Sequence, residues 1–467
     1  MKKIILCLSI LVGFTASEMK AQTNPAITSW LINTTGITGR HYLSGNSTPI
    51  NDTASANVQR VRYSNNFTYV NSSGIPSYIV GPYLDGNPAL ATNNAWLFKI
   101  PLNPVENTGA LTSTPFGSIG LFINGVPMYD YKDGASYNSS THQDDMMNGD
   151  GVWNRNAIMA ENDGFDCAKG HPSPIFNGPP GQGSLEGGSY HHHQNPTAFN
   201  LDLVEVSDVC QLYLADGLYT LDSTEHSPLI GFAFDGFPVY GAYGYANTDG
   251  TGGIKLIMSS YQKRNITTRT TYSDGTTVTA GPDVNTTFPL GWYREDYEFI
   301  ANSGDLDEHN GRFCVTPEYP NGTYAYFATV DVNWNSAYPY IIGPQYYGVV
   351  EASNISTGPG GNSVVVNEAV TEYEGPNGIA EDNLTSMNIA VFPNPASDLV
   401  AVQVKGILRT SLVVKMYDTK GSLVAETNLN QGSTIWHIDT RTIYSGEYIV
   451  VATDGKNTFS EKLLIQH

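Results

Sequence analysis

The chain has 467 residues, its formal net charge is −21, and only 14% of its residues are charged. This acidity argues against nucleic acids and anionic membrane surfaces as partners, and it favours cations. A low charged fraction with abundant glycine, tyrosine, asparagine and threonine is typical of an extracellular β protein with long polar turns.

The first 22 residues have the pattern of a secretory signal peptide. Lys2 and Lys3 precede an apolar run from Ile4 to Phe14, and cleavage is expected near Ala21 or Gln22. The apolar run is too short to span a bilayer, and no other stretch approaches transmembrane length. We therefore expect a mature exported chain with a net charge of (23 − 3) − (44 − 1) = −23.

Three cysteines remain after export, because Cys7 lies in the signal peptide. Cys167, Cys210 and Cys314 are an odd number in an oxidising compartment. We expect one disulfide and one free thiol, with a cysteine metal ligand as the alternative. The sequence does not assign the pair.

Residues 23–350 are predicted to form one large, β-rich domain. In its first part, short apolar runs such as residues 95–100 alternate with turn residues about every ten positions. No long amphipathic helix is evident there. The fold class we expect is all-β.

An internal repeat divides the large domain into two related half-units. Residues 120–129 (GLFINGVPMY) match residues 231–240 (GFAFDGFPVY), and the Asn-Gly and Asp-Gly pairs favour type I′ hairpin turns. Downstream, residues 188–193 (GSYHHH) match residues 322–327 (GTYAYF). Only the first half-unit has histidines on the matched strand.

The C-terminal part has a different composition. Residues 351–386 are rich in Gly, Pro and Asn and are predicted to be a linker, and residues 387–467 form a second β pattern. Motifs such as VFPNPAS (391–397) and YSGEY (444–448) closely resemble the type A sorting domain of the type IX secretion system of Bacteroidota. The resemblance implies a small β-sandwich, interaction with the type IX machinery, export across the outer membrane, removal of this domain, and release or surface attachment.

Three consecutive histidines, His191 to His193, follow Tyr190. Side chains alternate between the faces of an extended strand, so His191 and His193 share one face, and Tyr190 and His192 the other. Imidazoles at positions i and i+2 can present nitrogens to one point, which suits zinc or copper. The alternative is a solvated, histidine-rich loop.

Three more residues are candidates to complete such a site. They are His171 in a Gly-His-Pro segment, His226 before a Ser-Pro turn, and Asp166 as a carboxylate in place of one imidazole. Three or four imidazoles at one point fit copper or zinc. The alternative for His171 and His226 is a hydrogen-bonded turn histidine.

The order of these segments resembles the bacterial YHYH protein family over about residues 117–348. Tyr190, His191 and His193 match the first, second and fourth positions of the family motif, and His192 stands where the family has its second tyrosine. The Asp-Gly hairpin, DLDE (305–308) and TPEYPNGTY (316–324) also match. The resemblance implies membership of the family but no transferable biochemical role.

Asp305 and Asp307 are candidate ligands of a second cation, and calcium is the candidate ion. The spacing D-x-D-x-x-N-G departs by one residue from an EF-hand loop and lacks its distal glutamate. A capped turn paired with Arg312 is therefore the favoured interpretation.

Three functional hypotheses remain open. The large domain is an extracellular metal-binding module, a metal-dependent extracellular enzyme, or a surface protein that binds a glycan or small molecule and uses its histidines structurally. The sequence contains no H-E-x-x-H motif, no G-x-S-x-G motif and no phosphate-binding loop, so these motifs do not indicate a particular reaction.

Overall fold

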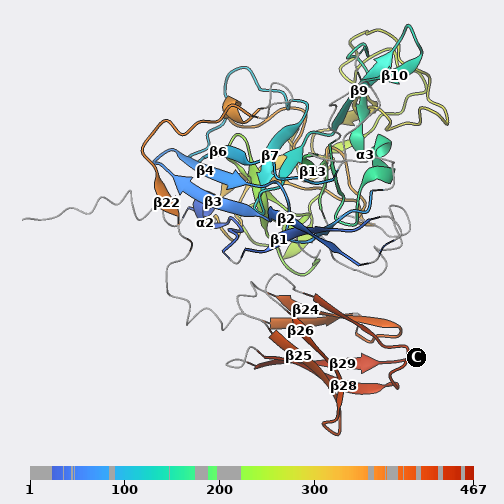
Figure 1. Ribbon diagram of the computed structural model, residues 1–467. Helices are drawn as coiled ribbons and strands as arrows, with labels where there is room; N and C mark the ends of the chain where they lie inside the picture. The colour runs from blue at the N-terminus through green and yellow to red at the C-terminus, as the bar shows by residue number, and fades with distance from the viewer. Residues whose placement is uncertain are drawn as a thin grey trace, which may run out of the picture.

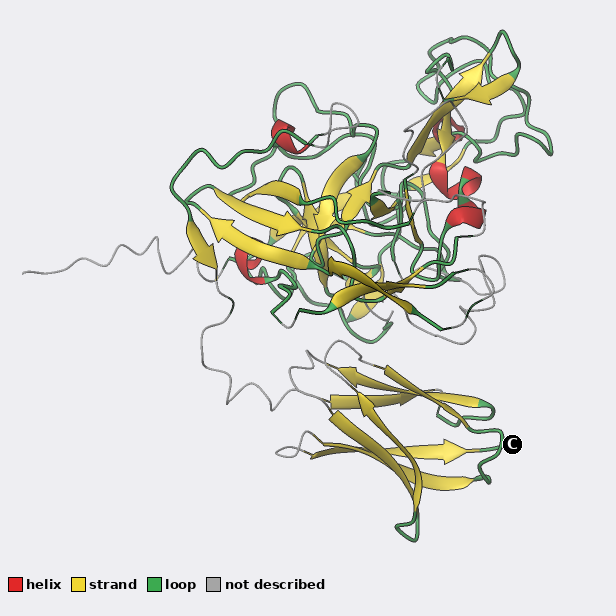
Figure 2. Ribbon diagram, viewed as in Figure 1, coloured by secondary structure: helices red, strands yellow, loops and turns green. Residues whose placement is uncertain are grey.

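A computed structural model describes residues 24–34, 36–43, 46, 48–83, 90–146, 148–173, 188–196, 222–355, 362–373, 375, 388–392, 394–405, 412–429, 435–453 and 458–467. The expected signal peptide lies outside the described residues. Strands and loops make up nearly all of the described chain, and the helices are short (Figure 2). The all-β prediction is confirmed.

An eight-stranded sheet forms the centre of the large domain. Its strands, in spatial order, are β12 (Gly170–Pro172), β13 (Tyr190–His192), β8 (Pro127–Tyr129), β7 (Ser118–Phe122), β14 (Leu229–Ala233), β15 (Pro238–Tyr240), β21 (Thr323–Phe327) and β20 (Gly311–Cys314).

Smaller sheets surround it (Figure 1). The four-stranded sheet consists of β22 (Thr371–Tyr373), β3 (Val58–Tyr63), β4 (Phe67–Ser72) and β6 (Trp96–Pro101). Two three-stranded sheets consist of β2 (Ile50–Ser55), β1 (Thr38–His41) and β5 (Ile79–Val80), and of β10 (Gln143–Asp145), β9 (Lys132–Asn138) and β11 (Asn154–Asn156). Two strand pairs consist of β16 (Tyr243–Tyr245) with β17 (Ile254–Leu256), and of β18 (Tyr261–Lys263) with β19 (Tyr297–Phe299). The helical turns are α2 (Pro25–Thr28), α3 (Ala157–Ala160), η1 (Asn162–Gly164), η2 (Arg294–Asp296) and η3 (Ala352–Asn354).

The four-stranded sheet and the central sheet share one hydrophobic core. Phe98 of β6 stacks on Phe234, with ring centroids 5.7 Å apart, and Trp30 packs against Phe232 of β14 at 5.4 Å. Every residue of β7 and β14 is buried. Apart from Ser118, the residues of the two strands are apolar or glycine, as expected for central strands covered on both faces.

The central sheet has the two-fold arrangement that the sequence repeat predicts. Its two hairpins, β7–β8 and β14–β15, meet where β7 and β14 pair antiparallel. On each side a parallel strand follows, β13 beside β8 and β21 beside β15, and then an antiparallel edge strand, β12 or β20. The duplicated hairpin units are confirmed.

The duplication extends to side chains. The Tyr190 hydroxyl donates a hydrogen bond to Asp166 (2.8 Å), and the Tyr324 hydroxyl donates one to Asp307 (2.9 Å). Each carboxylate also accepts from the backbone N–H of the glycine four residues later, at 3.0 and 3.1 Å. In both halves a tyrosine and an aspartate thus fix the loop that leads into the edge strand.

The two hairpin turns differ in one ionisable side chain, and this difference predicts how the stability of the protein depends on pH. Asn124 lies in the first turn, whereas Asp235 lies in the second, where burial raises its pKa to about 6 against hydrogen bonds from Tyr326, Gly348 and Phe237. The folded state then holds this proton more tightly than the unfolded chain, whose carboxyl titrates near 3.8. Stability is therefore lost as pH rises between about 4 and 6, by at most about 1.4 kcal/mol per pH unit.

We expect Asp235→Asn to lack this loss, because the amide does not titrate. Urea unfolding of both proteins at several pH values measures the difference. The free energy of unfolding of the variant, minus that of the wild type, should increase as pH rises through the window from about 4 to about 6. A difference that does not change with pH would contradict the prediction.

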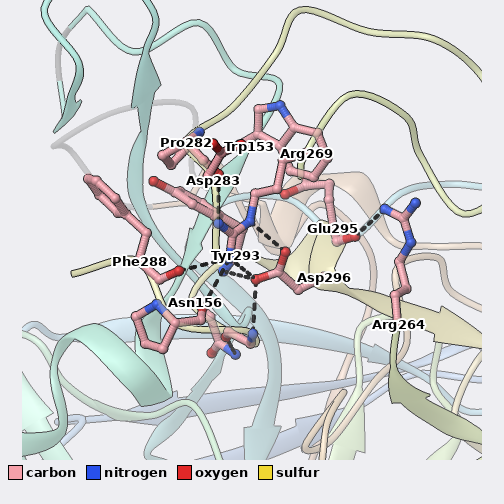
Figure 3. A network of polar contacts seen from close by, with 12 residues as sticks. Trp153, Asn156, Arg264, Arg269, Pro282, Asp283, Phe288, Tyr293, Glu295 and Asp296 are labelled. Atoms are coloured by element: carbon pink, nitrogen blue, oxygen red, sulfur yellow. Dashed lines mark hydrogen bonds and ion pairs between the residues drawn. The ribbon is translucent and has the colours of Figure 1, made fainter. Parts of the chain in front are cut away.

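A buried ion pair organises the segment between β18 and β19. Arg269 and Asp296 have no exposed side-chain surface and form two hydrogen bonds, of 2.7 and 2.8 Å (Figure 3). The guanidinium also donates to three backbone carbonyls, those of Pro282, Phe288 and Pro289. One side chain therefore holds several turns of a long irregular segment in place.

Part of the expected linker is built into the large domain. β22 pairs antiparallel with β3, and the Tyr69 hydroxyl donates a hydrogen bond of 2.6 Å to Glu368. The buried Asn354 side chain exchanges hydrogen bonds with the backbone of Lys99. Thr371, Glu372 and Tyr373 form this edge strand. The segment has few apolar residues, and for this reason the sequence predicted a linker here.

The C-terminal residues form two sheets around a core of their own. The sheets are β23 (Asn388–Phe392), β24 (Leu399–Lys405) and β27 (Ile435–Asp439), and β26 (Leu423–Leu429), β25 (Leu412–Asp418), β28 (Gly446–Thr453) and β29 (Thr458–Ile465). Elsewhere, Cys167 is bonded in a disulfide whose partner lies outside the described residues, and Cys314 is a buried free thiol.

Candidate metal centre

The edge strand β12 and its neighbour β13 bring three histidines together. His171 lies directly opposite His191 in the antiparallel register, and His193 follows at the end of β13. All three are buried, with at most 5% of their surface exposed. One potential ligand atom from each of the three histidines lies within 4.8 Å of those of the other two, which is close enough for a metal ion.

The hydrogen bonds of His191 and His193 define their tautomers. The Nδ1–H of His191 donates to the carbonyl of Ser189 (2.8 Å), and the Nδ1–H of His193 donates to the carbonyl of Asp130 (2.5 Å). A carbonyl can only accept, so both protons sit on Nδ1. In the neutral rings, the lone pairs are therefore on the Nε2 atoms, which lie 3.1 Å apart.

A carboxylate completes the cluster. Glu161, which follows α3, places Oε2 3.4 Å from Nε2 of His171 and 3.3 Å from Nε2 of His193. Its side chain is 25% exposed, so it is the least buried of the four groups. The cluster thus offers three imidazole nitrogens and one carboxylate, a common ligand set for zinc.

The charges of these groups depend on one another. Burial acts to raise the pKa of Glu161, but the nearby imidazoles of His171 and His193 outweigh it and lower the pKa. Burial acts to lower the pKa of His193, but Glu161 outweighs it and raises the pKa. Burial and the neighbouring histidines lower the pKa of His191. His193 and Glu161 therefore favour the charged form of one another, and a metal ion would displace any proton held at its nitrogen ligands.

Aromatic rings hold the imidazoles in place. Tyr129 of β8 stacks on His191 with ring centroids 3.7 Å apart and an interplanar angle of 17°. Phe165 contacts His171 edge-on, at 4.8 Å. These contacts restrict ring rotation, so the histidines are positioned before any ligand arrives.

His192 points away from the cluster, as strand alternation predicts. Its Nε2 contacts the Tyr78 hydroxyl at 2.6 Å, and its ring meets Phe122 edge-on at 5.4 Å. Burial lowers the pKa of His192 to about 3, so the ring is neutral. Its surroundings are those of a structural core histidine.

The other predicted ligands lie outside the cluster. Asp166 is fully buried and accepts hydrogen bonds from Tyr190, Gly81, Ala168 and Gly170, so its oxygens are already occupied. His226 packs in the second half-unit against Tyr240, Tyr245 and Phe327.

The predicted calcium ligands are also engaged by the protein itself. Asp305 accepts from Lys255 (2.7 Å) and from the N–H of Met258 (2.9 Å). Asp307 binds the Tyr324 hydroxyl and two backbone N–H groups. The two carboxylates therefore fix turns and do not face a common point, and Arg312 pairs with neither.

Glu161 was not a candidate from the sequence. It follows a four-residue helix and precedes a 3₁₀ turn, and neither element has a periodicity that shows which way a side chain points. Its distance of ten residues from His171 is the only signal, and acidic residues at that distance are common.

Residues 390–466 match the family described as secretion system C-terminal sorting domain. This domain directs the chain through the type IX secretion machinery, across the outer membrane, to the cell surface or the medium. No helix among the described residues is long and apolar enough to cross a membrane.

Other comparisons add little. None of the curated proteins matches the sequence. A solved structure of dimeric latent PorU from Porphyromonas gingivalis is 19% identical over 23% of this chain and 11% of that chain, with a TM-score of 0.16, and supports no argument about fold or function.

Residues 97–338 match the family described as YHYH protein. The matched range begins at β6, closer to the N-terminus than the expected 117–348, and it contains both half-units of the central sheet. It includes His171, His191, His193 and Glu161 and spans more than half of the chain. The chain belongs to the YHYH protein family.

Proposed function

We propose that the large domain binds a transition-metal ion, zinc or copper, through His171, His191 and His193, outside the cell. The observation that carries this proposal is the pair of Nε2 atoms 3.1 Å apart on His191 and His193. Two lone pairs at this distance repel one another unless a proton or a metal ion lies between them, and the metal ion is the alternative that we propose. Nitrogen ligands of a tetrahedral zinc ion lie about 3.3 Å apart, which follows from bonds of about 2.0–2.1 Å.

Glu161 is the fourth ligand in this proposal. Its oxygen lies near two of the three histidines, and its negative charge would offset part of the ion's charge in a buried site. The Nδ1–H bonds to backbone carbonyls are the outer-shell contacts that typically orient histidine ligands. Stacked Tyr129 supports His191 in the same way.

The metal content of protein produced without a histidine tag tests the proposal. We expect about one zinc or copper ion per chain, either as purified or after incubation with the ion and removal of excess. We also expect thermal stability to increase with the bound ion, because an ion that binds only the folded state stabilises it. Absence of both ions under both conditions would contradict the proposal.

A metal-dependent extracellular enzyme is the second candidate, and the partial exposure of Glu161 favours it. Catalytic zinc sites keep one position for water, often beside three protein ligands. Displacement of the 25% exposed Glu161 would open such a position. X-ray absorption of the zinc-loaded protein distinguishes the two: three protein ligands and a water support catalysis, and four protein ligands count against it.

A further inference from the structure

The second half-unit has a cluster of polar side chains at the position that corresponds to the metal centre. In the strand register, His171 lies opposite His191, and Arg312 lies opposite Ala325. His193 corresponds to Phe327 in the same register. In the second half-unit, the three positions that hold imidazoles in the first are therefore occupied by a guanidinium, a methyl group and a phenyl ring.

Arg312 has no carboxylate partner within ion-pair distance among the described residues. Its side chain is buried, with 8% of the residue exposed, and its guanidinium lies over Phe327, 5.4 Å from the ring centre. One Nη donates to the carbonyl of Tyr245 (2.6 Å), and Nε is buried without a hydrogen-bond partner. A buried guanidinium that lacks an anion is costly, so this one is suited to receive an anion.

His226 adds an acceptor to the same cluster. Its ring contacts Tyr245, with centroids 4.9 Å apart, and also faces Phe327. The Nδ1–H donates to the carbonyl of Ser227 (2.7 Å), which leaves the lone pair on Nε2, and Nε2 is buried without a partner. Burial lowers the pKa of His226, so the ring is neutral and accepts a hydrogen bond.

Glu318 supplies a second acceptor. Its carboxylate accepts a hydrogen bond of 2.8 Å from the hydroxyl of Tyr240, the counterpart of Tyr129. The ring of Tyr240 also contacts His226 edge-on, with centroids 5.1 Å apart, so Glu318 and His226 adjoin the same tyrosine. The cluster thus combines a cationic donor, two acceptors and aromatic faces.

We propose that Arg312, His226 and Glu318 bind a small carboxylate that also has hydroxyl groups, the class that includes sugar acids. The carboxylate pairs with the guanidinium of Arg312, and the hydroxyls donate to His226 and Glu318. The carbon skeleton packs on the partly exposed ring of Tyr245, as sugars pack on aromatic rings. This site belongs to the second half-unit and does not depend on metal binding in the first.

Calorimetric titration of the full-length, untagged protein with D-glucuronate and D-galacturonate tests the proposal. The control ligands are acetate, which lacks hydroxyls, and D-glucose, which lacks a carboxylate. We expect at least one uronate to bind about 10–100-fold more tightly than both, since a charge-assisted hydrogen bond contributes that much. Failure of both uronates to bind would overturn the proposal, and so would acetate or glucose binding equally well.

Two variants localise the site. Arg312→Gln should weaken uronate binding about 10–100-fold, because the amide retains hydrogen bonding but loses the charge. Its thermal unfolding shows whether it is folded. If Arg312→Gln does not fold, His226→Phe, which keeps the aromatic contacts and loses the acceptor, takes its place. His171→Gln, at the corresponding position of the first half-unit, should leave uronate binding unchanged, and equal effects of the two half-units would overturn the assignment.

Discussion

Replacing His193 with alanine is expected to reduce the affinity of the large domain for zinc or copper by at least about 100-fold. Loss of an outer-shell partner typically costs 10–100-fold, and loss of a ligand costs more. His193 is the histidine that contacts both His191 and Glu161, at 3.1 and 3.3 Å, so its removal breaks the cluster at its centre. Competition with a chromogenic chelator measures the affinity.

His192→Ala is the matched control for this prediction. His192 is the neighbouring residue of the same strand, equally buried, but its ring faces Tyr78 on the opposite side of the sheet. The control should lose thermal stability and keep the wild-type metal affinity. Equal affinity losses in the two variants would show that general destabilisation, and not ligand removal, explains the result.

Glu161→Gln separates the ligand role of the carboxylate from its size. We expect this variant to remain folded and to bind the ion more weakly than the wild type, because the amide carries no charge. Unchanged affinity would remove Glu161 from the ligand set and leave the three histidines.

Replacing Asp296 with alanine is expected to destabilise the large domain by about 3–5 kcal/mol. Removal of one partner from a buried ion pair leaves the other charge buried without compensation. Arg269 has no exposed side-chain surface, so it cannot turn outward to water. It would keep its three carbonyl acceptors, but no carboxylate would remain to balance its charge.

Urea unfolding measures this loss, and Glu372→Ala is the control. Glu372 forms an ion pair with Arg60, but both side chains are nearly half exposed. Exposed pairs contribute little, so the control should unfold at the wild-type midpoint. If Asp296→Ala matched the control, the network of Figure 3 would not hold the segment together.

The sequence predicted the parts of this structure that local signals define. Asn124-Gly125 and Asp235-Gly236 mark the two hairpin turns. The expected type I′ geometry is wrong, because it requires positive φ at both residues and only Gly125 (φ 81°) and Gly236 (φ 90°) have it. Strand alternation separated His191 and His193 from His192 without knowledge of the fold. The pairing of β7 with β14 has no comparable signal, because it joins strands more than 100 residues apart.

The membership of the histidine cluster was only partly predictable for the same reason. His171 and Asp166 are close in sequence, and both are polar residues beside turns, yet only His171 reaches the cluster. The difference arises because Asp166 binds Tyr190, on the face of β13 opposite to His191. Glu161 enters the cluster from a short helix, by tertiary packing alone.

The short strand β22 has a consequence for maturation of the exported protein. It covers the edge of β3, and it lies before the sorting domain in the chain. Proteolysis between residue 375 and β23 would release the sorting domain and leave β22 attached to the large domain. Proteolysis before residue 371 would instead uncover an unpaired strand edge, which is a template for aggregation. The position of β22 thus sets an N-terminal limit for a cut that yields a soluble mature product.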